Sequence, residues 1–481
     1  MIFGLLIVAG IVWMPLGIQP SADSLDTVFA KLRAAWSDAG RFTGERVDQY
    51  TIDAGGTPID VEARIRGNDY VVSAEPEGMH LLAGRAKGKR WRENSSGTVH
   101  VVRADVQGDD FDRWPVAALG FKEGDCTLAG TALLPHPAWV LADQPPNDIP
   151  RWLYVDMETG DIVREVSREG VRVETYDFSD ERGASGRRRA YRWQVRGPGG
   201  TETVTLSDWA PAPVAASEVA IPAQGPPVFD PPAAPQRVRA SFTPYRGIIV
   251  PLRFEGETHS FQLDSGTPEL IAADSLLTDG PVVLGHATAT TIEVDGMTAR
   301  DAAYLPVALF EDGLLGYDFF RGRIVHIDYA KGRLEVLPRD TFSPPIDALP
   351  LATDWSEGIP IVAAAVGDAT GSRFALDLGS PRLLLTRAFL ERSGAAAGIT
   401  ALGEHSKVVH FLEGPIEYVE AHSGTLQLGQ QRFEGATVEV ETGNPDNLAV
   451  PLDGIIGTDE LATSEWWFDA DGPLTWFRPN R

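Results

Sequence analysis

Two stretches of this 481-residue chain contain the same parts in the same order, and this duplication limits the possible folds more than any other feature. In the first stretch, an apolar strand pattern leads into "LDSGTP", which ends at Pro268, and "GLLGYD" follows, ending at Asp318. In the second, the corresponding parts are "LDLGSP", ending at Pro381, and "GIIGTD", ending at Asp459. A closing hairpin pattern follows each. Because such a repeat rarely arises by chance, we expect two similar β units in tandem.

The composition favours strands and turns over long helices. The chain has 49 Gly and 35 Pro, and its apolar stretches are short and interrupted. Its length suggests about two to four domains. We therefore expect a mainly β protein that begins with a helix and an antiparallel half-barrel.

The predicted helix and half-barrel precede residue 209. Apolar residues recur at helical spacing in residues 24–40, with Ser24 as N-cap and Gly40 as a stop. Beyond it, strand-like alternation continues to about Leu206 and includes "RWLYVDMETGDIVREV", in which "METGD" supplies a hairpin turn. The helical apolar positions are Leu25, Val28, Phe29, Leu32 and Trp36.

This helix-and-sheet pattern resembles the bacterial outer-membrane lipoprotein carriers and sorting proteins. The resemblance covers residues 24–206 and rests on strand order and on the hairpin residues Asp156, Thr159 and Gly160. It implies a concave sheet that faces an acyl chain, and hence a lipid or envelope partner. A folding or docking module without lipid is the alternative.

Proline-rich segments divide the chain. Residues 210–236 contain too many prolines for a sheet or helix and too few large apolar residues for a core, which predicts an extended linker, and a shorter joint spans Pro338–Pro350. The expected organisation is a signal peptide or membrane anchor at 1–22, a carrier-like β domain at 23–209, the linker at 210–236, and two repeat units at 237–340 and 341–481.

The apolar run from Ile2 to about Ile18 is similar to the core of an export signal. No Lys or Arg precedes it, and Pro20 lies close to the best cleavage point near Ala22, so a cleaved signal and a retained anchor both remain open. In either case the chain is expected to be exported, either periplasmic or membrane-anchored and facing the periplasm.

The charge of the chain excludes some partners. Its 42 Lys and Arg against 68 Asp and Glu give a net charge of −26, which repels phosphate backbones, so we expect no nucleic-acid binding. The single cysteine, Cys126, rules out an internal disulfide and any multi-cysteine metal site. The 9 histidines show no metal-binding spacing, and we expect neither a metal nor a cofactor.

The repeat motifs resemble those of the retropepsin-like aspartic peptidases. Apolar-Asp-Ser-Gly-Thr at Leu263–Thr267, followed by the apolar-apolar-Gly pattern within Gly313–Phe320, carries the resemblance, which extends over residues 240–481. It implies two β-barrel lobes that form a pseudo-two-fold bilobal unit. It also implies an exported endopeptidase that acts on a peptide or protein substrate, and a monomer in which the lobes pair within one chain.

In that family each lobe supplies one catalytic aspartate. The matching positions are Asp264 and Asp377, and two carboxyls this close share a proton, so that one activates water while the other polarises the peptide carbonyl. Five residues are expected to support the two loops: Ser265, Gly266, Thr267, Gly379 and Ser380.

Leu378 departs from the family pattern, which has Thr or Ser between Asp and Gly. One half of the hydroxyl network between the loops is therefore missing. Three alternatives to the peptidase follow. The chain is a catalytically degenerate binding protein of the cell envelope that holds a peptide, lipid or protein; or the first repeat pairs between two chains; or Asp264 is a structural turn residue.

Overall fold

The computed structural model describes most of the chain after the leader. The residues described are 18–35, 45–53, 58–75, 80–103, 123–134, 136–144, 150–169, 172–184, 187–197, 200–245, 247–277, 287–307, 309, 312–401, 407–411, 414–434, 437–442 and 452–480. Residues 1–17 of the expected leader, together with Trp36 and Gly40, lie outside this set. No helix among the described residues has the length and apolar character needed to cross a membrane.

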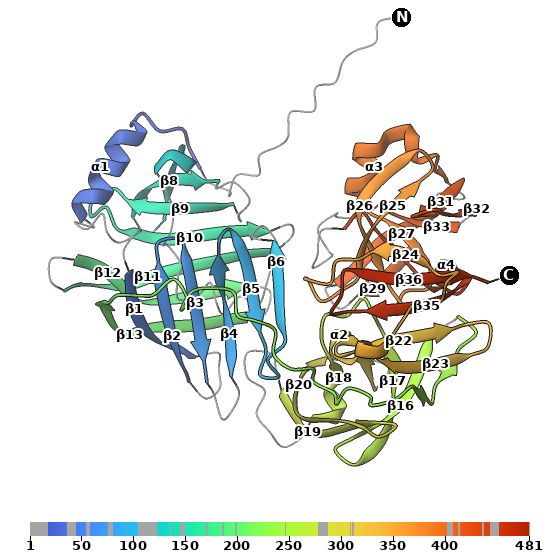
Figure 1. The fold of residues 1–481 in the computed structure, drawn as a ribbon. Helices are drawn as coiled ribbons and strands as arrows, with labels where there is room; N and C mark the ends of the chain where they lie inside the picture. Colours follow the sequence, from blue (N-terminus) through green and yellow to red (C-terminus); the bar gives the residue numbers. More distant parts are fainter. Residues whose placement is uncertain are drawn as a thin grey trace, which may run out of the picture. The chain divides into compact units, whose positions relative to one another are not determined.

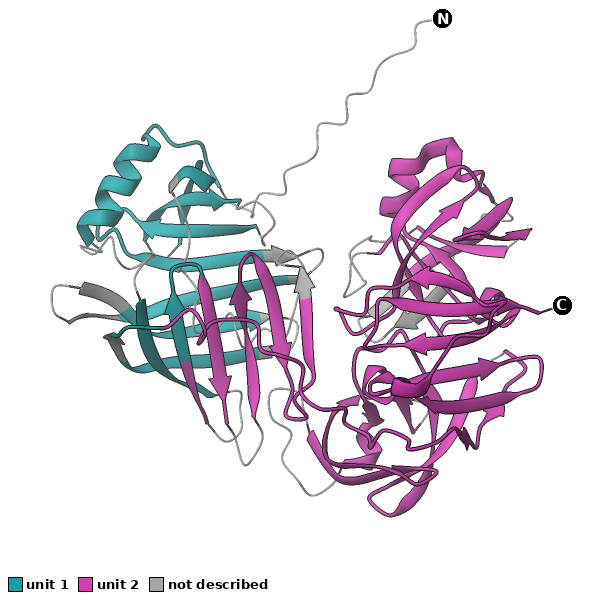
Figure 2. Cartoon of the chain, viewed as in Figure 1, with its two compact units in different colours: residues 1–58, 63–68, 113–214 teal, residues 59–62, 69–112, 215–481 magenta. Residues whose placement is uncertain are grey.

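The chain forms two compact units (Figure 2). The first contains residues 1–58, 63–68 and 113–214, and the second contains residues 59–62, 69–112 and 215–481. The domain boundaries expected from the sequence stay predictions, and each unit is described by itself.

The first unit is an antiparallel sheet with one helix (Figure 1). Its strands lie in the order β1-β13-β12-β11-β10-β9-β8-β7. Their bounds are β1 (Glu45–Asp53), β7 (Cys126–Leu133), β8 (Pro137–Asp143), β9 (Arg151–Asp156), β10 (Ile162–Glu169), β11 (Arg172–Ala184), β12 (Arg187–Gly197) and β13 (Gly200–Pro211).

Helix α1 (Leu25–Ala35) begins where the sequence predicts it, because the Ser24 hydroxyl accepts a hydrogen bond from the Thr27 amide at 3.2 Å. Its apolar stripe buries Val28 and Phe29 against Leu153 of β9. A helix over one end of the sheet results, as its periodicity indicates.

Strand β9 confirms the predicted alternation of side chains. Leu153 and Val155 pack beneath α1, while Trp152 and Tyr154 belong to a second cluster on the other face of the strand. Both faces of this part of the sheet are therefore covered, which explains why five consecutive residues of β9 are buried.

The second unit begins with an antiparallel set of strands in the order β6-β5-β4-β3. Their bounds are β3 (Asp69–Ala74), β4 (Leu81–Ala86), β5 (Lys89–Glu93) and β6 (Val99–Arg103). Strand β2 (Ile59–Arg66) is divided between the two units. This set lies about 160 positions before the first repeat in the chain and yet belongs to the same compact unit.

The first repeat is a seven-stranded sheet in the order β15-β16-β17-β21-β18-β20-β19, and an additional pairing of β16 with β19 closes it into a small barrel. The elements are β15 (Ser241–Phe242), β16 (Ile248–Phe254), β17 (Glu257–Leu263), β18 (Ile271–Ala273), β19 (Ala287–Val294), β20 (Met297–Val307), β21 (Gly313–Leu315) and helix α2 (Tyr317–Phe320).

The second repeat is a ten-stranded sheet in the order β28-β30-β33-β27-β34-β26-β25-β31-β32, with β29 paired to β30. Its elements are β25 (Ile361–Val366), β26 (Ala369–Leu376), β27 (Leu383–Leu385), α3 (Arg387–Ser393), β28 (Thr400–Ala401), β29 (Lys407–Phe411), β30 (Gly414–His422), β31 (Thr425–Leu428), β32 (Gln431–Glu434), β33 (Thr437–Glu441), β34 (Gly454–Ile456) and α4 (Thr458–Leu461).

The two repeats share an unusual strand arrangement. Strand β17 runs parallel to β21, and the corresponding β26 runs parallel to β34. Strand β18 pairs antiparallel with β21 and parallel with β20, and β27 pairs in the same way with β34 and β33. The duplicated sequence therefore folds into duplicated structure.

A third sheet in the second unit combines strands from both repeats. Its order is β14-β23-β22-β35-β36-β24, with β14 (Gln236–Val238), β22 (Arg323–Asp328), β23 (Arg333–Pro338), β24 (Leu349–Ala352), β35 (Ser464–Asp469) and β36 (Leu474–Pro479). The two closing hairpins meet where β22 pairs antiparallel with β35. One hydrophobic core extends through both repeats and includes Phe261, Phe319, Phe374 and Trp466.

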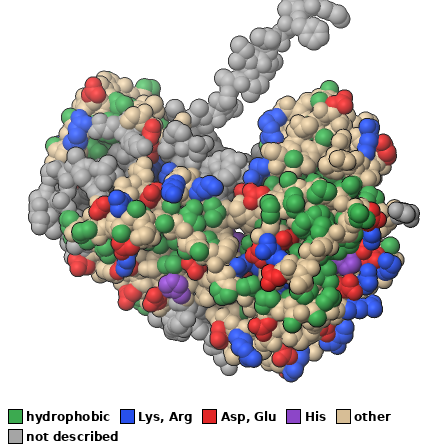
Figure 3. All heavy atoms as spheres, viewed as in Figure 1, with side chains coloured by type: hydrophobic (Ala, Val, Ile, Leu, Met, Phe, Trp, Pro, Cys, Tyr) green, Lys and Arg blue, Asp and Glu red, His purple; other side chains and the backbone are tan. Residues whose placement is uncertain are grey.

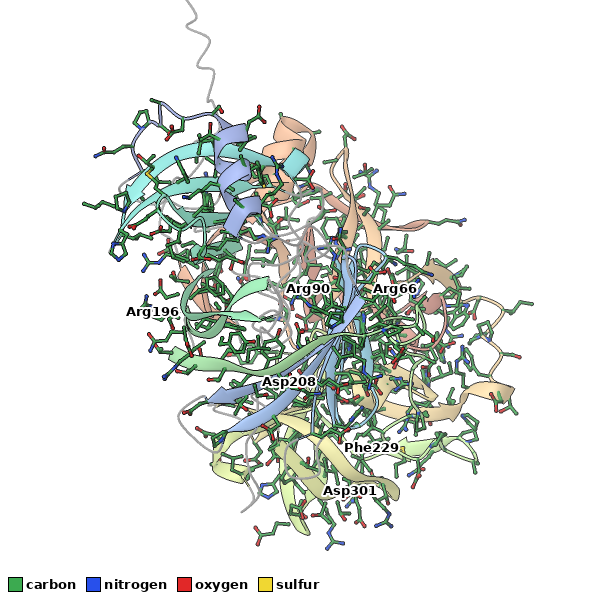
Figure 4. All side chains as sticks on the ribbon, turned by 90° about the vertical axis from the view of Figure 1, so that its left-hand side faces the viewer. Arg66, Arg90, Arg196, Asp208, Phe229 and Asp301 are labelled. Atoms are coloured by element: carbon green, nitrogen blue, oxygen red, sulfur yellow. The ribbon has the colours of Figure 1, made fainter. Side chains whose placement is uncertain are left out.

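The proline-rich segment differs from its prediction in one respect. Residues 212–235 form no regular helix or strand, as expected, but Phe229 is fully buried in the core of the repeats. Its ring packs against Phe319 and against the guanidinium of Arg323 (Figure 4 labels Phe229). The prediction of too few large apolar residues for a core overlooked Phe229, because one aromatic residue leaves no periodic signal.

The expectation of a mainly β chain with antiparallel sheets and an N-terminal helix is confirmed.

Candidate functional site

Asp264 and Asp377 occupy equivalent positions in the two repeats. Each follows directly after a strand, β17 or β26. The amide of Asp264 donates to the carbonyl oxygen of Leu315 at 3.1 Å, and the amide of Asp377 donates to that of Ile456 at 2.9 Å. Both aspartates are therefore held by the last residue of the parallel neighbouring strand.

Each carboxylate is bound by its own loop. Asp264 accepts hydrogen bonds from the Gly266 amide at 2.8 Å and from the Thr267 hydroxyl at 3.0 Å. Asp377 accepts from the amides of Gly379 at 2.7 Å and Ser380 at 3.1 Å. The two loops thus differ, because the Ser380 hydroxyl turns away and donates to the carbonyl oxygen of Arg382.

The structure brings the two aspartates together, with each carboxyl lying against the glycine of the opposite loop. The glycines make this approach possible. A Cβ atom added to Gly266 would lie 2.6 Å from the carboxyl carbon of Asp377, and one added to Gly379 would lie 2.4 Å from that of Asp264. No side chain fits at either position, since real Cβ atoms essentially never approach a heavy atom this closely.

Ser265 forms a hydroxyl bridge between the two loops. Its hydroxyl donates to the carbonyl oxygen of Leu376 at 2.7 Å and accepts from the amide of Leu378 at 3.0 Å. Leu378 has no hydroxyl that could donate to the Asp264 loop, and its side chain is fully buried in the core. The bridge between the loops is therefore one-sided.

The environment raises the pKa of both carboxyls. Burial raises the pKa of Asp264, although hydrogen bonds from Asp377, Gly266 and Thr267 oppose the rise. Burial raises the pKa of Asp377 well above its ordinary value, and the adjacent charge of Asp264 adds to the effect. Because a second negative charge beside the first is costly, the two carboxyls titrate as one coupled pair.

Two residues near the site have roles that the sequence did not indicate. The amide nitrogen of the Gln262 side chain donates to the carbonyl oxygen of Gly379 at 3.3 Å, which adds a second link between the loops. Asp318 lies in the first turn of α2 but does not cap it, because its carboxylate accepts from the amide of Leu270 at 3.2 Å. In the sequence, Gln262 appears only as a polar residue two positions before Asp264, and this does not predict its contact with the second loop.

The described residues contain no group of three or more His, Cys, Asp or Glu side chains placed to hold a metal ion. Two adjacent carboxyls that hold one proton between them offer a hydrogen-bond donor beside an acceptor. A neutral ligand group that both donates and accepts matches it.

No protein-family model and no curated protein matches the sequence. Among solved structures, the chain is similar to a LolA superfamily protein from Nitrosomonas europaea, at 12% identity and a TM-score of 0.33, over 41% of this chain and 98% of that one. It is also similar to a DUF1329 family protein from Desulfovibrio piger, at 13% identity and a TM-score of 0.28, over 38% of this chain and 90% of that one.

These findings do not support the expected assignment of residues 240–481 to the retropepsin-like aspartic peptidases, which is withdrawn together with the expected activity of an aspartic endopeptidase. The physical reason for the error is that Asp-x-Gly-Thr/Ser is a sequence that tight turns after strands favour in general. A duplicated turn of this kind brings two carboxyls together without specifying a reaction.

Proposed function

We propose that this chain is a non-catalytic binding protein of the cell envelope, exported or membrane-anchored, whose ligand contacts the Asp264–Asp377 pair. The observation that supports it is the adjacency of two buried carboxyls, because a pair that holds one proton offers a donor beside an acceptor. The surrounding amides and the Ser265 bridge hold both groups in place without the ligand.

The proposed ligand at this pair is a polypeptide segment. A peptide group carries one N–H donor and one C=O acceptor, which match a pair of carboxyls that holds one proton. An anionic ligand is disfavoured, since the chain carries a net charge of −26. Neutral or basic segments should therefore bind best.

The lipid partner expected for the first unit is a separate proposal. Helix α1 covers one end of the sheet face that includes Leu153. Beside Leu153 on this face, Arg151 donates to the buried Asp143 at 2.7 Å and lies close to the buried Glu165. Such a face favours a ligand with a polar group over a bare acyl chain. Solvent extraction of the purified protein, followed by mass spectrometry, tests for it.

The experiment for the acid pair measures binding of fluorescent peptide libraries, neutral, basic and acidic, to the purified full chain at pH 5 and pH 7.5. Mass spectrometry of the recovered peptides checks that they stay intact. We expect reversible binding of intact peptides, and at least a tenfold loss of affinity in Asp264→Asn, which removes the charged acceptor. Asp459→Asn is the control, because its exposed side chain lies at the equivalent of position 318 and outside the pair.

Two outcomes would overturn the proposal. One is the absence of binding by a protein whose circular dichroism and unfolding transition are normal. The other is peptide cleavage that disappears in Asp264→Asn, which would make the pair catalytic and restore the enzyme assignment.

A further inference from the structure

The turn between β5 and β6 is built to present one hydroxyl group. The side-chain oxygen of Asn94 accepts hydrogen bonds from the amides of Ser96 and Thr98, both at 3.1 Å. Gly97, with φ of 76°, allows the chain to reverse between them. As a result Thr98 is fully buried, with its side chain directed away from its own turn and toward the first repeat.

The Thr98 hydroxyl donates to one carboxylate oxygen of Asp318 at 2.7 Å. The other oxygen accepts from the amide of Leu270 at 3.2 Å. Asp318 is 1% exposed, so its two hydrogen bonds replace contacts that water would otherwise make. Through Asp318, a residue of the β5–β6 turn is therefore connected to the loop that begins with Asp264.

Two further contacts hold the same loop from the same side. Arg92 of β5 forms an ion pair with Glu269 at 3.3 Å, and Glu269 is 4% exposed. The amide of Tyr317 donates to the carbonyl oxygen of Thr267 at 3.0 Å. We call these contacts, together with Thr98–Asp318–Leu270, the first-loop clamp.

The second repeat shares only part of this clamp. The amide of Thr458 donates to the carbonyl oxygen of Ser380 at 2.8 Å, in the same way as Tyr317 to Thr267. The residue equivalent to Asp318 is Asp459, and its side chain is exposed rather than buried against a turn of the chain. The second loop has different side-chain contacts, since Arg382 forms ion pairs with Glu420 and Glu439.

We propose that Thr98 is a positioning residue for the Asp264 side of the acid pair, acting through Asp318 on the backbone at Leu270. The role in ligand binding rests on the function proposed above, whereas the clamp itself does not. It ties the Asp264 loop to strands that lie outside the repeats.

The test compares Thr98→Val, which keeps the shape but removes the hydroxyl, with Thr98→Ser, which keeps the hydroxyl. Hydrogen–deuterium exchange is measured on the full chain in peptides that cover residues 261–271 and 374–385. We expect exchange in residues 261–271 to rise at least tenfold in Thr98→Val, with residues 374–385 unchanged. Thr98→Ser should exchange as the wild type does, and so should Asp459→Asn.

The pH dependence of peptide binding is a second readout, which a purely structural role would not move. In Thr98→Val the midpoint of this dependence should shift, because the Asp264 carboxyl is held less firmly beside Asp377, and Thr98→Ser should restore it. Unchanged exchange in residues 261–271, or an equal rise in both peptides, would overturn the clamp. A wild type that binds no peptide would overturn the proposed function, while the exchange measurement would still decide the role of Thr98.

Discussion

At position 379 any side chain would occupy space that the Asp264 carboxyl fills. We expect Gly379→Ala to lower the free energy of unfolding by about 1–3 kcal/mol, the usual cost of overpacking a close-packed interior. Urea unfolding of the full chain measures it. Gly424→Ala is the matched control, because an added Cβ there meets nothing within 4 Å, and its cost should stay within about 0.5 kcal/mol. Equal costs at both positions would mean that the carboxyl moves aside freely.

The raised pKa of Asp318 should make the free energy of unfolding depend on pH. Burial raises its pKa to about 6, with the nearby Glu269 adding to the rise, while hydrogen bonds from Thr98 and Leu270 and the charge of Arg321 oppose it. A carboxyl whose folded pKa lies above its unfolded value contributes stability that is present at low pH and is lost as the pH rises through the folded pKa.

Asp318→Asn should remove this dependence. From pH 4 to pH 7, the stability of the variant relative to the wild type should improve by about 3 kcal/mol, since two pKa units correspond to roughly that free energy. Urea unfolding at both pH values measures the difference. Asp459→Asn, at the exposed equivalent position, should show no such trend. Parallel pH profiles for wild type and Asp318→Asn would show that Asp318 ionises as an exposed carboxyl does.

Among the elements, the segment before β14 depends on one buried arginine. Arg323 of β22 is fully buried and donates to the carbonyl oxygens of Arg321 at 3.0 Å and Phe229 at 2.7 Å. Burial lowers its pKa to about 10, which still leaves it charged at neutral pH. The guanidinium therefore fastens a segment without regular structure to the core of the first repeat.

We expect Arg323→Ala to cost about 3 kcal/mol or more, because it leaves a cavity beside Phe229 and removes the partners of buried carbonyl oxygens. Thermal and urea unfolding measure the cost. Arg253→Ala is the control, since its side chain is 59% exposed and pairs at the surface with Glu293, and such a pair contributes at most about 1 kcal/mol. A loss of less than 1 kcal/mol in Arg323→Ala would contradict this role for the arginine.

Elements with local signals were predictable from the sequence. In the turn between β9 and β10, the Asp156 carboxylate accepts from the amides of Glu158 and Thr159 at 2.9 and 2.7 Å, and Gly160 adopts φ of 79°. These are the preferences that identify "METGD" as a turn. The placement of the β5–β6 turn against Asp318 had no such signal, because neither segment shows in its own sequence that the other is near.

The whole molecule should be a monomer, because both aspartates of the pair come from one chain. The face of the molecule in Figure 3 shows acidic and basic side chains interspersed, and this mixture together with the net charge of −26 disfavours self-association. Light scattering coupled to size exclusion should give the mass of one chain for the wild type and for Asp264→Asn. A dimer that dissociates in Asp264→Asn would instead place the pair between two chains.

The amino-acid sequence alone was sufficient to predict the duplication, the mainly β class, the N-terminal helix and the two aspartates at equivalent turns. Each of these depends on periodicity or on turn preferences, which involve neighbouring residues. Only the tertiary structure decided that the two carboxyls lie against each other's loops, that Ser265 bonds to Leu378 113 positions later, and that Thr98 reaches the Asp264 loop through Asp318. Such contacts arise when buried polar groups find partners across the packed sheets, and a hydrogen bond between distant segments leaves no pattern in either one.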